Sequence, residues 1–206
     1  MQTVFTYETD TQKLLVKRTE IYRYLGYKTG MTINCEMEDM IEEILQNVLK
    51  GSSAKVCYKR FPIVIDEEID FGFMRVKSKE LKANLKDCNE VVIFAATIGL
   101  YTDRQIQKES ILSPARALIY QAVGAAVVEA LCDEFNKSLE REEQEKGNFV
   151  RPRYSPGYGD ASLTMQKDIL RELDCAKRIG ITLSDSYLMI PEKSVTAFVG
   201  IKKQDK

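Results

Sequence analysis

At residues 90–97 the sequence reads EVVIFAAT, a continuous apolar run of strand length. Such runs are typical of a central strand that is buried on both faces. A longer segment follows at residues 113–147, SPARALIYQAVGAAVVEALCDEFNKSLEREEQEKG, with Ser113 as a helix N-cap and Pro114 at the first helical position. Its first half is apolar and alanine-rich, and its second half is strongly charged. We therefore expect one long helix that is buried at first and then emerges into solvent.

Two helices are predicted on the N-terminal side of this strand. Residues 11–25 carry apolar positions at helical spacing and end near Gly26, a suitable C-cap. Residues 34–51 carry a fuller apolar stripe, with Asn34 as the N-cap and Gly51 as the stop signal.

The remaining segments favour strands and one more helix. Residues 54–76 are rich in β-branched and aromatic side chains, and the alternation over 69–74 predicts a half-buried strand. Residues 162–180 predict a helix capped by Ser162, and 181–201 predict two strands joined by a tight turn at Pro191. The chain shows no internal repeat or linker, so we expect an α+β fold over residues 1–206. This single domain has a mixed or mostly antiparallel sheet covered by helices.

The composition narrows the class of function. The 206 residues carry a net charge of -1, which argues against a nucleic-acid-binding protein. No apolar run approaches the roughly 18 residues that span a bilayer, and the N-terminus MQTVFTYETD lacks the pattern of a signal peptide. We therefore expect a cytoplasmic protein that binds neither nucleic acid nor membrane.

The cysteine and histidine content limits the chemistry. Five cysteines are scattered without a C-x-x-C pair, so they predict buried free thiols and neither disulfides nor a metal site. Histidine is absent, which excludes Ser-His-Asp and Cys-His nucleophiles and histidine metal ligands.

The segment RPRYSPGYGD, residues 151–160, concentrates residues that can hold a ligand. Arg153 offers a planar fork for a carboxylate, and Gly157 lets a ligand approach the backbone. Tyr158 offers a ring face for an adenine or a sulfonium cation, and the backbone at Ser155 can bond a polar edge. The alternative is a surface connector whose prolines and glycines only shape a turn.

The motif RYSPGY resembles the Arg-x-x-x-Gly-Tyr motif of the activation domain of vitamin B12-dependent methionine synthase. The segments QKDILRELDCAKRIGITLSDSYLMIPEKSVTAFVGI and FAATIGL also resemble that family, most strongly over residues 88–201. The resemblance implies the family's fold and S-adenosylmethionine as the cofactor. It implies that Arg153 and Tyr158 contact this ligand directly, Ser155 does so through its backbone, and Gly157 allows close approach.

The resemblance also implies a function. An electron from a flavodoxin- or ferredoxin-type donor reduces inert Co(II) cobalamin to Co(I), which takes the methyl group of S-adenosylmethionine. No proton moves in this displacement, so no catalytic acid or base is expected. The chain lacks the histidine of the corrinoid-binding signature Asp-x-His-x-x-Gly. We therefore expect cobalamin to be supplied by a partner, either a separate methionine synthase subunit or another corrinoid protein. The alternative is a non-catalytic S-adenosylmethionine-binding subunit that regulates or scaffolds a corrinoid methyltransferase complex.

Two further features leave alternatives open, and a third departs from the family's pattern. The acidic run at 139–146 either places a carboxylate near the sulfonium or forms a solvated helix end. Thr97 and Gly99 either approach the ligand or belong to a buried strand and its turn. The large enzymes of the family continue past the closing strands and add a tyrosine there, whereas this sequence ends KKQDK.

Overall fold

The computed structural model describes residues 3–28 and 30–203. The helices are η1 (Thr11–Lys13), α1 (Arg18–Tyr24), α2 (Cys35–Gly51), α3 (Lys79–Asn84), α4 (Tyr101–Leu112), α5 (Pro114–Glu145), α6 (Met165–Glu172) and α7 (Cys175–Arg178). The strands are β1 (Phe5–Thr9), β2 (Ala54–Pro62), β3 (Val64–Ile65), β4 (Ile69–Asp70), β5 (Arg75–Val76), β6 (Glu90–Thr97), β7 (Phe149–Val150), β8 (Thr182–Leu183), β9 (Met189–Ile190) and β10 (Ser194–Lys202).

Five strands form the main sheet in the order β1-β2-β6-β10-β7, and each neighbouring pair is antiparallel. The predicted α+β class with a mostly antiparallel sheet is therefore confirmed. β6 lies in the middle, as its apolar run predicted, with Phe94 opposite Tyr58 of β2 and Ala197 of β10.

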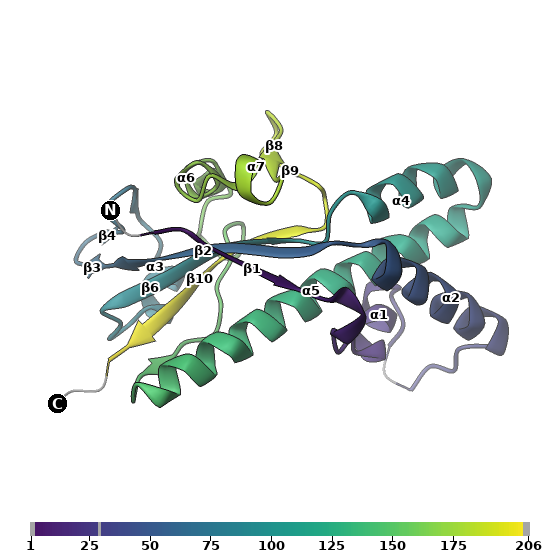
Figure 1. Ribbon diagram of the computed structural model, residues 1–206, viewed down its shortest axis with the longest axis horizontal. Coiled ribbons are helices and arrows are strands. Elements are labelled where there is room, and N and C mark those ends of the chain that lie inside the picture. The colour runs from purple at the N-terminus through teal and green to yellow at the C-terminus, as the bar shows by residue number, and fades with distance from the viewer. Residues whose placement is uncertain (1–2, 29, 204–206) are drawn as a thin grey trace.

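The sheet is covered on both faces, because alternate side chains of β6 enter two different cores. Val92, Phe94 and Ala96 pack with residues of α2 and α5, whereas the odd-numbered residues from 91 to 95 pack with α6 and α7. Figure 1 shows the two layers, with α6 and α7 on one side of the sheet and α5, α1 and α2 on the other.

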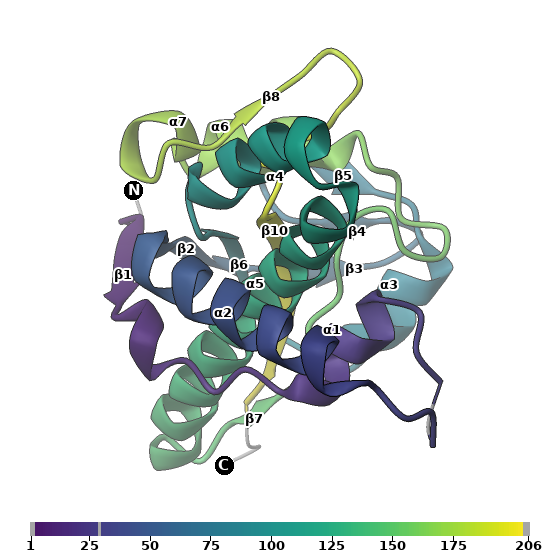
Figure 2. The ribbon, with the colours of Figure 1, turned by 90° about the vertical axis from the view of Figure 1, so that its right-hand side faces the viewer.

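The long helix α5 is the core helix of the fold. It contacts α1, α2 and α4, which surround it in Figure 2. A Cβ on Gly124 would lie 2.6 Å from Cγ2 of Thr102, so the glycine permits the close approach of α4. By length and composition α5 is also long and apolar enough to cross a membrane, although its sequence contains no uninterrupted apolar run of that length. However, 67% of its apolar window is buried within the protein, as expected for a core helix.

Several local predictions were correct. The side chain of Asn34 accepts a hydrogen bond from Met37 N at 2.8 Å and caps α2, which ends at Gly51. Pro114 occupies the first turn of α5, although Ser113 makes no side-chain capping hydrogen bond.

The helix predicted over residues 11–25 is wrong in its first half. Leu14 is extended after the short η1 helix, and α1 begins only at Arg18. The hydroxyl of Thr11 donates to the carbonyl of Leu49 at 2.5 Å, and Leu14 is buried in the core. These contacts with α2 replace a further helical turn.

The strand predicted over 69–74 is also wrong, because the chain turns within it. Gly72 has φ +82° and donates to Oδ1 of Asp70 at 2.7 Å, so β4 and β5 pair as a short hairpin. The helix α4 was not predicted. It buries only Thr102 and Glu109, so it has no apolar stripe in the sequence.

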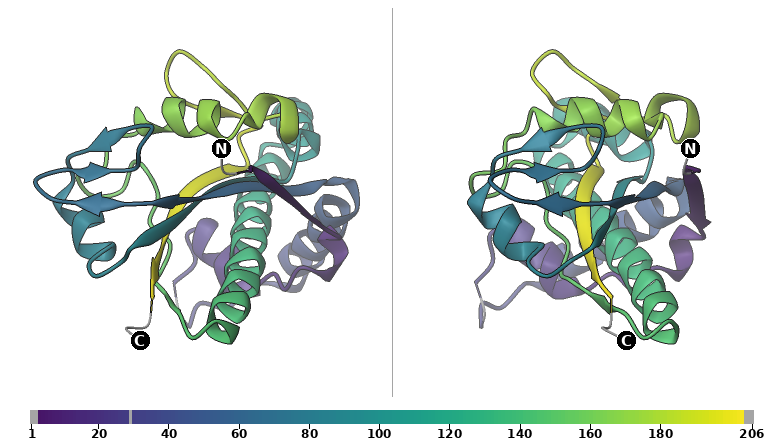
Figure 3. Two further views of the ribbon diagram at one scale, coloured as in Figure 1. Left: turned by 60° about the vertical axis from the view of Figure 1, so that its left-hand side comes forward. Right: turned by 90° about the vertical axis from the view of Figure 1, so that its left-hand side faces the viewer.

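The C-terminal third differs in its boundaries and pairing. Ser162 does not cap a helix reaching Gly180; α6 begins at Met165, and a separate helix α7 follows. Nor do the last strands pair with each other at Pro191. β8 pairs with β9 through a loop that projects from the body in both views of Figure 3. β10 pairs instead with β6 and β7, because its apolar side chains fill both cores.

Candidate functional site

The segment that carries the motif first runs alongside β10. After β7, Arg151 N donates to Gly200 O at 2.8 Å, and Tyr154 N donates to Phe198 O at 2.9 Å. This pairing fixes the direction in which successive side chains point. It ends at Tyr154, so the chain leaves the sheet there and the outer edge of β10 from Ser194 to Thr196 has no neighbouring strand in the described residues.

The next four residues form a tight turn. Tyr158 N donates to Ser155 O at 3.3 Å, and Gly157 has φ +93°. A proline followed by a residue with positive φ is typical of a type II turn, which explains Pro156 and Gly157. Gly157 N also donates to Ala161 O at 2.8 Å, so the turn is closed on its inner side.

The far end of the loop is held by a helix terminus. The carboxylate of Asp160 accepts hydrogen bonds from Lys79 N at 2.7 Å, from Glu80 N at 3.2 Å and from the hydroxyl of Ser78. The hydrogen bond from Ser78, together with these backbone donors, lowers the pKa of Asp160. Within the loop, the hydroxyl of Tyr154 donates to Tyr158 O at 2.9 Å.

Between this loop, α5, α6 and the free edge of β10 lies a groove of about 540 Å³. This volume is within the range of small-molecule sites. The groove is lined by Glu80, Glu129, Arg153, Tyr154, Ser155, Pro156, Tyr158, Gly159, Gln166, Met189, Ser194, Val195 and Thr196. Three of the four predicted site residues are therefore brought together. Gly157 is not part of the lining, and its role here is the positive φ of the turn.

Arg153 lies in the groove lining as a cation, and its guanidinium is already paired. One terminal nitrogen lies 2.6 Å from Oδ1 of Asp133 and the other lies 2.5 Å from Oε2 of Glu129, both on α5. Burial alone would lower the pKa of Arg153, but these carboxylates and the nearby Cys132 raise it above its ordinary value. The arginine therefore stays charged and forms one half of a fixed charge pair at the groove.

Several polar groups of the lining were missed by sequence reasoning, among them Glu129, Gln166 and Thr196. Glu129 lies in the apolar half of the predicted long helix, and a carboxylate in such a place was a usable signal. Gln166 and Thr196 are almost fully buried, and Oε1 of Gln166 and Oγ1 of Thr196 have no hydrogen-bond partner in the part of the chain that the structure describes. No sequence pattern marked these two residues.

The other candidates have structural roles. In the acidic run, Glu143 is buried and accepts from Arg60, Lys146 and Asn148; burial opposes ionisation, but these donors lower its pKa to about 2. The hydroxyl of Thr97 accepts from that of Ser194 at 2.9 Å, and neither Thr97 nor Gly99 lines the groove.

The thiols are mostly core residues, as predicted. Cys57, Cys88, Cys132 and Cys175 are buried, whereas Cys35 is exposed at the start of α2. Within residues 3–28 and 30–203, no group of three or more cysteine, aspartate or glutamate side chains is arranged to hold a metal ion.

Comparison with known proteins identifies the family of this chain. The family described as "Vitamin B12 dependent methionine synthase, activation domain" matches residues 82–206, which is more than half of the chain. No curated protein matches the sequence. Among solved structures, the MetH reactivation domain bound to AdoHcy matches with a TM-score of 0.71 and 14% identity, over 100% of this chain and 80% of that one. The likeness in structure shows a common fold, and the sequence match shows that the chain belongs to the family of vitamin B12-dependent methionine synthase activation domains.

Proposed function

We propose that the groove binds S-adenosylmethionine. The observation that carries this proposal is that charged side chains and neutral, unpartnered polar side chains line the same groove. The charge pair of Arg153 with Glu129 lies against α5, whereas the unpartnered neutral groups come from β10 and α6; a third charged side chain of the lining, Glu80, lies on α3. S-adenosylmethionine has the same division, with a zwitterionic amino acid at one end and an uncharged nucleoside at the other.

The amino-acid end fits the charge pair. In this proposal, the guanidinium of Arg153 binds the carboxylate of the ligand, and the carboxylate of Glu129 beside it accepts a hydrogen bond from the ligand's ammonium group. Because Glu129 and Asp133 already hold the guanidinium, the ligand carboxylate meets a side chain whose orientation is fixed before binding. Tyr158 is 69% exposed, which leaves its ring free to cover the adenosyl or sulfonium portion.

The bound ligand supplies an electrophilic methyl group on sulfur, and its transfer requires neither a proton donor nor a base. The residues of this chain contribute by binding and orienting the ligand, so no catalytic side chain is assigned. We further propose that the protein is a cytoplasmic reactivation module. In this role it presents the methyl group to cobalamin held by a separate methionine synthase subunit, with a flavodoxin- or ferredoxin-type donor as the source of electrons.

The test has two stages. Calorimetry with S-adenosylhomocysteine, which lacks the reactive methyl, should give saturable binding at one site. The protein is then mixed with a Co(II) corrinoid partner, a reductant and S-adenosylmethionine labelled at the methyl carbon. Label on cobalt supports reactivation. Saturable binding without transfer supports the alternative of a regulatory or scaffolding subunit, and no binding contradicts both.

A further inference from the structure

Two buried polar atoms in the groove have unmet hydrogen-bonding capacity. Gln166 and Thr196 are 6% and 2% exposed, and among residues 3–28 and 30–203 neither Oε1 of Gln166 nor Oγ1 of Thr196 has a hydrogen-bond partner. An unpartnered buried polar group destabilises a fold because it has lost its hydrogen bonds to water without replacement. Buried polar atoms are usually paired with protein, with water or with a ligand.

The neighbouring Ser194 shows that this part of β10 can satisfy a hydroxyl internally. Its hydroxyl donates to Oγ1 of Thr97 at 2.9 Å and approaches Pro191 O at 2.8 Å. Thr196 lies two positions further along the same strand and therefore faces the same side, yet it has no such partner. The difference is thus specific to the part of the groove below α6.

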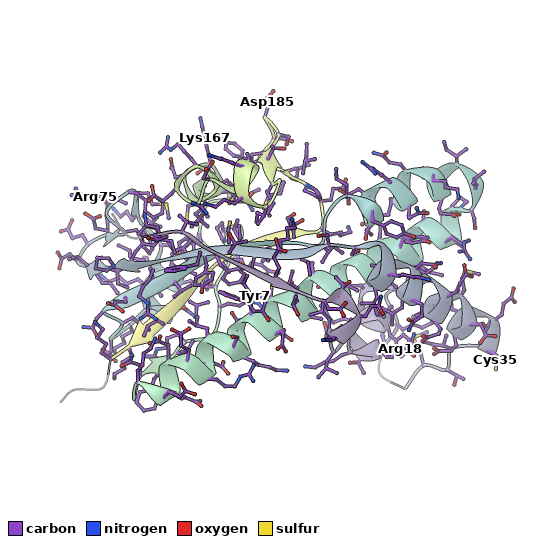
Figure 4. All side chains as sticks on the ribbon, viewed as in Figure 1. Tyr7, Arg18, Cys35, Arg75, Lys167 and Asp185 are labelled. Atoms are coloured by element: carbon purple, nitrogen blue, oxygen red, sulfur yellow. The ribbon has the colours of Figure 1, made fainter. Side chains whose placement is uncertain are left out.

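The two groups come from opposite layers. Thr196 projects from the sheet, and Gln166 lies on the buried side of α6, beside Met165 and Ile169. Its neighbour Lys167 points outward into solvent (Figure 4). Both unpartnered groups are neutral, and α6 lies on the opposite side of the sheet from α5, with which Arg153 makes its charge pair (Figure 1). A neutral, flat ligand portion with both donors and acceptors suits this end of the groove.

Adenine meets this requirement, because its exocyclic amine is a donor beside ring nitrogens that are acceptors. A glutamine amide pairs with this edge through an accepting oxygen and a donating NH₂ group. We propose that Oε1 of Gln166 accepts a hydrogen bond from the exocyclic amine of the adenine and that the hydroxyl of Thr196 bonds the same ring. This assignment rests on the proposed function and makes these two residues the determinants of base specificity.

The test compares S-adenosylhomocysteine with its analogue that has purine in place of adenine and so lacks only the amine. The wild-type protein should bind the analogue about 3- to 10-fold more weakly, as expected for one neutral hydrogen bond. Gln166→Met should bind both ligands with equal affinity. Thr196→Val should weaken S-adenosylhomocysteine by a similar factor, while the Tm of the free protein stays equal or rises because an unpartnered hydroxyl has been removed.

Two variants serve as controls. Ser194→Ala removes a hydroxyl that is satisfied within the protein, so it should lower the Tm and leave the ratio of the two affinities unchanged. Lys167→Ala should change neither. If Gln166→Met keeps the preference for the amine, or Thr196→Val binds as tightly as wild type, the assignment is wrong although the groove still binds the ligand. If the wild-type protein does not bind S-adenosylhomocysteine, the proposed function fails and the assignment fails with it.

Discussion

Replacement of Arg153 by alanine separates the roles of this side chain in the fold and in the groove. The side chain is 24% exposed, and its partners Glu129 and Asp133 are 33% and 43% exposed. These pairs are therefore intermediate between surface pairs, which contribute 1 kcal/mol or less, and buried pairs, whose disruption costs 3–5 kcal/mol. After discounting for solvent, we expect Arg153→Ala to lower stability by about 2 kcal/mol, which lowers the Tm of a chain this size by about 4–8 °C.

The effect on binding should be confined to the amino-acid end of the ligand. A hydrogen bond to a charged group contributes about 1.5–3 kcal/mol, so the loss of about 2 kcal/mol weakens S-adenosylhomocysteine by about 30-fold. 5′-Methylthioadenosine has no carboxylate, and its affinity should stay as in wild type. Calorimetry with both ligands, at a temperature where each variant is folded, measures the difference.

Arg151→Ala is the matched control, because Arg151 lies in the same segment but donates to Lys86 O at 2.9 Å and does not line the groove. It should leave both affinities unchanged. If Arg153→Ala binds S-adenosylhomocysteine like wild type, or loses both ligands equally, Arg153 does not bind the carboxylate.

Three further predictions concern the turn, the helix packing and the acid stability. Gly157→Ala should lower the free energy of unfolding by about 1–2 kcal/mol, because alanine disfavours the φ of +93°, and it should also weaken ligand binding. Gly180→Ala, at a glycine with φ +74° and open space around it, should lower only the Tm, so equal losses of binding in the two variants would contradict the role of the turn. Gly124→Ala should lower stability by about 1–3 kcal/mol by pushing α4 from α5, and an unchanged Tm would exclude that contact. The pKa of Glu143 falls from 4.5 to about 2 on folding, so its contribution of up to about 3 kcal/mol is present above pH 4.5 and is lost as the pH falls towards 2. Urea denaturation across this range should show a shallower pH dependence for Glu143→Gln than for wild type.

The structural elements that could be predicted from the sequence are mainly those that depend on residues close together in the chain. The cap at Asn34, the proline at the start of α5 and the buried strand β6 follow from local patterns. The helix α4 could not be found in this way, because its fully buried side chains are the polar Thr102 and Glu109, and the two apolar side chains that pack on the core, Tyr101 and Ile106, do not make a continuous stripe. The pairing of β10 depends on residues about a hundred positions away.

The residues of the groove show the same difference between local patterns and long-range packing. Arg153, Ser155 and Tyr158 stand within six residues, so one motif was enough to place them in one groove. Glu129, Gln166 and Thr196 come from three distant elements, and only the packing of α5, β10 and α6 brings them to that groove. The engagement of Arg153 with two carboxylates also depends on this packing and was not foreseen.

The position of β10 has a consequence for the order in which the site can form. This strand supplies one wall of the groove and also the partner along which the motif segment runs, yet it follows the motif in the sequence. A nascent chain that has emerged only as far as residue 193 would carry the whole motif and still have no site for a ligand. Binding competence is therefore acquired only after residues 194–202 leave the ribosome and insert beside β6.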